Sequence, residues 1–195
     1  MRACGKRELA FVVLGFAGLV VCPGLAGAAD APKEARAPDS VYVGTPHDVV
    51  VKMLHLAKVT QKDVVYDLGC GDGRIVVMAA KLYGCRGVGY EIDPPMVAAA
   101  RAYARKHRVE SLVTIEQEDI FTVDLRPATA ILLYVLPSMN EKLIPQYAKM
   151  RPGSRIVAHD YGIEGMRADQ VVEFLSEEDN AKHTIYVYTT PLKSE

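Results

Sequence analysis

The stretch YDLGCGDGRIV, residues 66–76, constrains the fold more than any other part of the chain. It carries glycines at three alternate positions, Gly69, Gly71 and Gly73, between an apolar run and a helix-forming stretch. A buried strand, a glycine turn and a helix in this order begin a βαβ unit, whose turn holds a ligand at the carboxyl end of the strand. The sequence therefore predicts a parallel sheet with a ligand site at this turn.

The rest of the chain repeats the alternation of strand and helix signals. Strands are expected at residues 63–68, 87–91, 112–116, 128–134, 153–159, 171–175 and 183–189. Helices are expected from residue 45 to 57, with Thr45 as the cap and Asp48 reaching back to it, and at 74–83, 93–108 and 138–150. Pro145 is expected to bend or break the last one. This order predicts an α/β fold: a Rossmann-like, doubly wound, mostly parallel seven-stranded sheet. Helices cover both of its faces, and the last two strands form a C-terminal antiparallel hairpin.

Residues 1–28 differ in composition from the rest of the chain. Basic residues precede an apolar stretch at 9–21, and the small residues Ala26-Gly27-Ala28 follow. This order is typical of a secretory signal peptide, here with cleavage after Ala28. The apolar stretch is shorter than the ~20 residues that span a bilayer, but without cleavage it becomes a candidate N-terminal anchor. We expect export to the periplasm or membrane association, followed by a polar linker at 29–41 and one domain at 42–195.

Charge and cysteine content exclude some classes of partner. The 23 Lys and Arg residues are balanced by 24 Asp and Glu, a formal charge of −1, so nucleic acid is not an expected partner. Cys70 and Cys85 flank a predicted strand of about five residues, roughly 16 Å long, which is beyond the ~7 Å limit for a disulfide. Two free thiols are predicted, and no metal site, because no paired Cys or His spacing occurs. We expect a monomer.

The identity of the ligand follows from what the glycine turn lacks. The Gly-Lys-Ser/Thr of a phosphate-binding loop is absent, and Gly73 comes one residue too early for the G-x-G-x-x-G dinucleotide fingerprint. Asp67 and Asp72 would also repel a pyrophosphate. Carboxylates in this place favour a cationic ligand without phosphate. S-adenosylmethionine fits, with Asp67 near its ammonium group and Glu91 accepting hydrogen bonds from its ribose.

The motifs resemble those of a known class of enzymes. DLGCGDG resembles the first motif of Rossmann-like S-adenosylmethionine-dependent methyltransferases, and Tyr90–Asp93 resembles the acidic end of their second strand. Residues 118–121 resemble the segment whose acid faces the adenine amino group. The resemblance implies a cofactor site made of Thr45, Asp67, Gly69, Gly71, Gly73, Glu91, Asp119 and Ile120.

A narrower resemblance covers residues 42–189. The segments YVGTPHDVVVKMLHLAKV, YVLPSMNEKL and GSRIVAHDYGI resemble small protein-lysine methyltransferases. This family includes an archaeal broad-specificity enzyme and mitochondrial enzymes acting on the ATP synthase c subunit and the adenine nucleotide translocator. Gly44 stands where YVPTP-type members carry proline. The resemblance implies N-methylation of lysine in a protein substrate, including a membrane-associated one, while a small-molecule methyltransferase and a non-catalytic binding module remain alternatives.

Methyl transfer is an in-line attack on a carbon bound to sulfur, so the protein mainly aligns donor and acceptor and keeps the attacking amine neutral. Tyr134, at the end of the fourth predicted strand, is the candidate for lining the amine channel. Asp160 and Tyr161, which follow the fifth strand, are its candidate partners. His159 is expected to be packed and hydrogen-bonded without a catalytic role.

Overall fold

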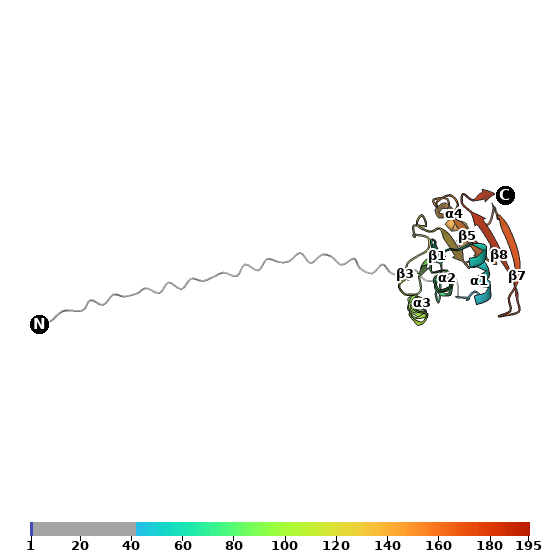
Figure 1. Ribbon diagram of the computed structural model, residues 1–195. Coiled ribbons are helices and arrows are strands. Elements are labelled where there is room, and N and C mark those ends of the chain that lie inside the picture. The colour runs from blue at the N-terminus through green and yellow to red at the C-terminus, as the bar shows by residue number, and fades with distance from the viewer. Residues whose placement is uncertain (2–41) are drawn as a thin grey trace. The chain divides into compact units, whose positions relative to one another are not determined.

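The computed structural model describes Met1 and residues 42–195 (Figure 1). The expected signal peptide or anchor and the linker at 29–41 lie outside the described residues, so export and cleavage stay predictions. Within the described part of the chain, no helix combines the length and the apolar character needed to span a bilayer.

Helices and strands alternate through the first part of the domain. The helices of the described residues are α1 His47–Leu56, α2 Arg74–Tyr83, α3 Pro94–Lys106 and α4 Pro137–Tyr147. The first five strands are β1 Val64–Leu68, β2 Arg86–Glu91, β3 Val113–Gln117, β4 Ala130–Leu133 and β5 Arg155–His159. The remaining strands are β6 Met166–Arg167, β7 Gln170–Leu175, β8 Lys182–Thr189 and β9 Lys193–Ser194.

The strands form one large sheet in the order β3-β2-β1-β4-β5-β8-β7 (Figure 1). The first five strands pair in parallel, whereas β8 is antiparallel to both β5 and β7. The predicted seven-stranded, mostly parallel sheet with a C-terminal hairpin is therefore confirmed. A second small sheet pairs β6 with β9 and was not predicted, because strands of two residues have no detectable periodicity.

Both faces of the central strands β1, β4 and β5 are buried. Alternate residues of the central strands point to opposite faces. On one face, Val65 and Leu132 belong to a core that α1 and α2 cover; on the other, Tyr66 and Ile131 pack in a core with Tyr147 of α4. A third buried cluster joins α2, α3 and β3. The expected covering of both faces by helices is therefore present.

Two local expectations about helix α1 are wrong. Thr45 does not cap this helix, which begins at His47, because the Thr45 hydroxyl lies 3.1 Å from Nδ1 of His159. The carboxylate of Asp48 does not reach back either. It accepts hydrogen bonds from the Ser176 hydroxyl at 2.9 Å and the Glu177 N–H at 2.7 Å, and so ties α1 to the β7–β8 loop. Both side chains found tertiary partners in place of the local ones.

Pro145 lies inside α4 without ending the helix. A proline removes one helical hydrogen bond, and here it does so in the last turn. Leu143 and Tyr147 are both fully buried against the sheet, which holds this turn in place. The expected break is therefore absent. The expected free thiols are present, since Cys70 and Cys85 are both buried and unbridged.

Candidate functional site

A pocket lies where the carboxyl ends of β1, β2 and β4 meet. The sheet order puts β1 between β2 and β4. From β2 the chain continues outward to β3, and from β4 it continues outward in the opposite direction to β5. Parallel sheets bind ligands at such a reversal of strand order. Six of the eight predicted cofactor residues line this pocket: Thr45, Asp67, Gly69, Glu91, Asp119 and Ile120.

Gly71 and Gly73 support the pocket from outside its lining. At Gly71, where φ is +51°, a Cβ atom would collide with the ring of Tyr42. At Gly73, where φ is +78°, a Cβ atom would lie 3.0 Å from Cβ of Ala100 in α3. These glycines therefore let the N-terminal segment and α3 approach the turn, and their contact with the ligand stays a prediction.

Asp67 carries a buried carboxylate without a partner. The residue is 2% exposed, and its Oδ2 accepts no hydrogen bond. Among the described residues, only Gln146 has another such buried side-chain atom. Burial raises the pKa of Asp67 well above its ordinary value, and the charges of Glu91 and Asp72 raise it further. A cation in the pocket would supply the missing partner and stabilise the ionised form.

Glu91, the last residue of β2, is held by the backbone around it. Its Oε2 accepts the Gly71 N–H at 2.8 Å, and its Oε1 accepts the N–H groups of Ile92 and Asp93 at 2.8 and 3.0 Å. A carboxylate has roughly four acceptor positions, so about one remains for a ligand hydroxyl. The turn after β1 and the end of β2 are thereby locked together at the pocket.

Asp72 does not face a ligand. Its carboxylate forms a two-pronged ion pair with Arg74, with Nη2 to Oδ2 at 2.8 Å and Nε to Oδ1 at 3.0 Å. Burial raises the pKa of Asp72, but the bonds and charge of Arg74 outweigh this effect and leave the pKa lowered. Arg74 therefore offsets much of the charge with which Asp72 was expected to repel a phosphate, and Asp67 is the stronger support for the argument from charge.

Arg74 also forms part of the wall near the start of the domain. Its Nη1 donates to the carbonyl oxygen of Thr45 at 2.9 Å. A Cβ atom at Gly44 would lie 2.5 Å from the guanidinium carbon of Arg74. The glycine that stands in place of proline therefore makes room for this guanidinium.

Tyr134 lines the pocket, whereas Asp160 and Tyr161 lie behind it. The rings of Tyr134 and Tyr161 are nearly parallel, with centroids 5.9 Å apart, and the ring of His159 lies 4.2 Å from that of Tyr134. Burial raises the pKa of Tyr134, and the neighbouring charge of Asp160 adds to this effect. The three predicted catalytic residues therefore lie together at one end of the site, although only Tyr134 reaches the pocket itself.

His159 is 1% exposed and hydrogen-bonded, as expected. Its Nδ1 lies 3.1 Å from the Thr45 hydroxyl, and its Nε2 lies 2.8 Å from Nδ1 of His183 in β8. Burial lowers the pKa of His159 to about 4 despite the opposing charge of Asp160. His183 could not be selected from the sequence, because it joins the site only through the pairing of β5 with β8.

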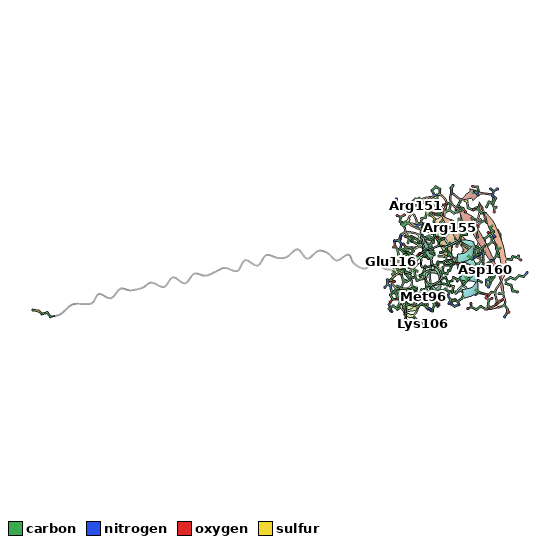
Figure 2. The ribbon with its side chains drawn as sticks, viewed as in Figure 1. Met96, Lys106, Glu116, Arg151, Arg155 and Asp160 are labelled. Atoms are coloured by element: carbon green, nitrogen blue, oxygen red, sulfur yellow. The ribbon has the colours of Figure 1, made fainter. Side chains whose placement is uncertain are left out.

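The sequence reasoning also missed pocket residues that follow predicted strands. Met96, in the first turn of α3 (Figure 2), and Met139, in the first turn of α4, both line the pocket. Each lies a few residues after the carboxyl end of a strand, which is a signal that could have identified them. Tyr42 lines the pocket too; it is the first residue of the segment YVGTP, which had supported only the family resemblance.

Comparison with known proteins agrees with this geometry. Residues 67–170 match the family model described as the ANTKMT methyltransferase domain. The chain is 40% identical over 153 residues to a protein-lysine N-methyltransferase of Saccharolobus islandicus, covering 77% of this chain and 94% of that protein. It is 34% identical over 119 residues to the mouse adenine nucleotide translocase lysine N-methyltransferase, covering 60% of this chain and 51% of that protein.

A solved structure with a different stated acceptor is also similar. It is described as an RNA methyltransferase from Salinibacter ruber in complex with S-adenosyl-L-homocysteine. Its sequence is 44% identical and its TM-score is 0.72, with 76% of this chain and 94% of that chain covered. Because the family model matches more than half of the chain and the archaeal relative is matched over nearly its whole length, this protein belongs to the ANTKMT methyltransferase domain family.

Proposed function

We propose that this protein methylates the side-chain amine of lysine in a protein substrate. As a member of its family it is an S-adenosylmethionine-dependent methyltransferase, and the lysine acceptor is the proposed part. One observation carries the proposal: a single pocket has the unpartnered carboxylate of Asp67 at the glycine turn and Tyr134 at the end of β4. The first suits a cationic methyl donor, and the second suits an incoming amine.

The donor's binding follows from the residues around the turn. In this proposal Asp67 pairs with the donor's ammonium group, and Glu91 accepts a ribose hydroxyl at its remaining acceptor position. Asp119 and Ile120, which follow β3, lie beside the adenine. The donor supplies a methyl group on a positively charged sulfur, which makes the carbon electrophilic.

The acceptor end must align an amine and keep it neutral. The amine nitrogen forms a bond to the methyl carbon as the carbon–sulfur bond breaks, and the amine loses a proton to solvent. We assign Tyr134 to orienting this amine through its hydroxyl. Asp160, 27% exposed, would attract the lysine ammonium as it arrives, and Tyr161 would extend the aromatic wall.

A protein acceptor is favoured over RNA by two observations. The archaeal relative, matched over 94% of its length, is named for protein lysine. The chain has a formal charge of −1, whereas binding to a phosphate backbone needs a cationic surface. The Salinibacter structure, 44% identical and named for RNA, keeps RNA methylation as the second candidate.

The deciding experiment incubates the full chain with donor labelled in its methyl group and a cell extract, and then divides the product. One part receives protease and the other ribonuclease before separation. Label that resists ribonuclease, disappears with protease and yields methyl-lysine on hydrolysis supports the proposal. Label lost with ribonuclease supports RNA, solvent-extractable label supports a small molecule, and either result rejects the lysine acceptor. The Asp67→Ala variant is the control for background labelling.

We further propose that the N-terminal apolar stretch, residues 9–21, places a monomeric enzyme outside the cytoplasm or at a membrane. The basic residues before this stretch and the small residues after it support this placement. Fractionation followed by sequencing of the mature N-terminus tests it. A chain that begins at Met1 in the soluble cytoplasmic fraction would contradict the proposal, and sedimentation of the purified protein tests the monomer.

A further inference from the structure

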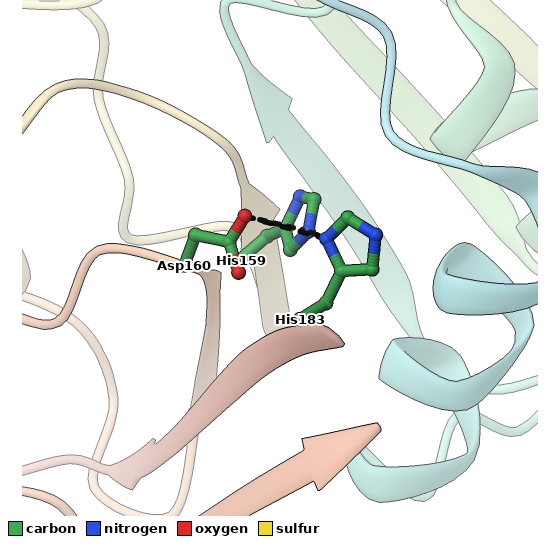
Figure 3. A group of neighbouring side chains, drawn as sticks. All are labelled: His159, Asp160 and His183. Atoms are coloured by element: carbon green, nitrogen blue, oxygen red, sulfur yellow. Dashed lines mark hydrogen bonds and ion pairs between the residues drawn. The ribbon is translucent and has the colours of Figure 1, made fainter. Parts of the chain in front are cut away.

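Three potential metal ligands converge beside the pocket. His159 ends β5, Asp160 follows it, and His183 comes from β8, so the chain brings them together only by folding (Figure 3). Nε2 of His159 lies 2.8 Å from Nδ1 of His183, and Oδ2 of Asp160 lies 3.3 Å from each of these nitrogens. These three atoms form one compact triangle of donors.

The size of this triangle suits a transition-metal ion. Zn²⁺ binds imidazole nitrogen and carboxylate oxygen at about 2.0–2.2 Å, so neighbouring ligands in a tetrahedral site lie about 3.3 Å apart. In an octahedral site the separation is about 2.9 Å. The observed separations of 2.8 to 3.3 Å span these values. An ion slightly above the plane of the triangle would reach all three atoms without movement of the strands.

The outer contacts of both histidines also match a metal site. Ligating histidines hold their second ring nitrogen with a carboxylate or another polar group, which fixes the ring. Nε2 of His183 lies 3.1 Å from Oδ2 of Asp179, and Nδ1 of His159 lies 3.1 Å from the Thr45 hydroxyl. Each ring is therefore held through one nitrogen, while its other nitrogen faces the triangle.

We propose that His159, Asp160 and His183 bind a divalent transition-metal ion of the Zn²⁺ type. Two imidazoles and one carboxylate form a three-ligand site that leaves at least one position for water, on the side where Asp160 is 27% exposed. The ion joins the end of β5 to β8 directly behind Tyr134, whose ring lies against that of His159. The expectation of no metal site considered only spacing along the chain, and His159 and His183 are 24 positions apart.

The competing explanation is a hydrogen-bond network that only ties the two strands together. In that case one proton lies between the two histidines, and no ion is needed. The two explanations differ in whether Zn²⁺ is bound, and this measurement needs neither methyl donor nor acceptor. Its outcome is therefore distinguishable from that of the methylation assay. A bound ion would neutralise the Asp160 carboxylate, so the attraction of lysine by Asp160 applies to the metal-free protein.

The test titrates the full chain, after removal of metal with a chelator, with Zn²⁺ in a calorimeter and with Co²⁺ in an absorption spectrometer. We expect one ion per chain, a visible Co²⁺ absorption, and a rise in melting temperature on Zn²⁺ addition. Asp160→Asn should weaken Zn²⁺ binding at least tenfold, because the amide loses the charge while its oxygen can still accept the Thr184 N–H that now lies at 2.8 Å. His183→Ala should abolish the Co²⁺ absorption.

The matched control is His55→Ala, which removes an exposed histidine of α1 and should leave Zn²⁺ affinity unchanged. Absence of binding by the wild-type chain overturns the proposal. Equal affinity in the wild type and in Asp160→Asn also overturns it, because the ion then binds elsewhere. Asp160→Asn decides the question even if His183→Ala does not fold, and circular dichroism checks the fold of each variant.

Discussion

Replacing Asp67 by asparagine should weaken donor binding without weakening the fold. Asp67 is buried and its Oδ2 has no hydrogen-bond partner. Its negative charge therefore destabilises the ligand-free protein and stabilises a complex with a cation. Loss of one charge-assisted contact of about 1.5–3 kcal/mol corresponds to an increase of about 10- to 150-fold in the Kd for S-adenosylmethionine. Calorimetric titration of wild type and Asp67→Asn measures this ratio.

The pH dependence of stability gives the second half of this prediction. Because the pKa of Asp67 is raised in the folded protein, the folded state holds a proton that the unfolded state releases above its ordinary pKa of 3.8. The contribution of Asp67 to the free energy of unfolding therefore falls as the pH rises above about 4. An asparagine at position 67 does not ionise, so urea unfolding at neutral pH should show the variant at least as stable as the wild type.

Asp63 is the matched control, because it lies just before the other end of the same strand and shows the opposite behaviour. Its carboxylate accepts hydrogen bonds from Thr129 at 2.6 Å, from Thr60 at 2.7 and 2.8 Å, and from Arg155 at 2.8 Å. Burial alone would raise the pKa of Asp63, but these hydrogen bonds outweigh burial and lower the pKa to about 2. The difference from its ordinary value of 3.8 corresponds to about 2.5 kcal/mol of stability.

The stabilisation by Asp63 is present above pH 4 and is lost as the pH falls toward 2. Asp63→Asn should therefore lower the free energy of unfolding by about 2 kcal/mol at neutral pH and leave donor affinity unchanged. Asp67→Asn should therefore lower donor affinity without loss of stability, whereas Asp63→Asn should lower stability without loss of donor affinity. Unchanged donor affinity in Asp67→Asn, or a loss of stability in it equal to that of Asp63→Asn, would refute the assignment of Asp67 to the donor's cationic group.

Three further predictions concern other parts of the site. Glu91→Ala should weaken donor binding by about 1.5–3 kcal/mol in calorimetry, because the ligand's hydroxyl and the Gly71 N–H both lose a charged acceptor; an unchanged Kd would contradict this. Tyr134→Phe should lower turnover about 10- to 100-fold with an unchanged donor Kd, since only the hydroxyl is lost, and a wild-type rate would move the acceptor site elsewhere. Gly73→Ala should lower the free energy of urea unfolding by about 1–2 kcal/mol, because φ is +78° and the new methyl group meets Ala100; unchanged stability would show that α3 can shift.

The order of strands and helices could be read from the chain alone. Strand and helix signals depend on neighbours within a few residues, and the glycine turn at 69–73 places one ligand site at the end of β1. Parallel strands put their carboxyl ends at one edge, so Asp67, Glu91 and Tyr134 could be grouped without coordinates. These residues do line a single pocket.

Tertiary structure decided how each charge is used. Asp67 and Asp72 look equivalent in the sequence. In the structure Asp72 forms an ion pair with Arg74, whereas Asp67 is buried with its Oδ2 unpartnered. The cost or benefit of a carboxylate depends on burial and on atoms within a few ångströms, which local sequence does not specify. Thr45 likewise reads as a helix cap but contacts His159.

Contacts between distant segments lay beyond sequence reasoning for the same reason. Nothing near His183 marks it as part of the site, and it meets His159 because β8 pairs antiparallel with β5. The register of that pairing follows from burial of alternate side chains across the whole sheet, a property of the assembled core. The sequence by itself therefore indicated which residues form the methyl-donor site. Only the folded sheet brought together the cluster of His159, Asp160 and His183 behind Tyr134.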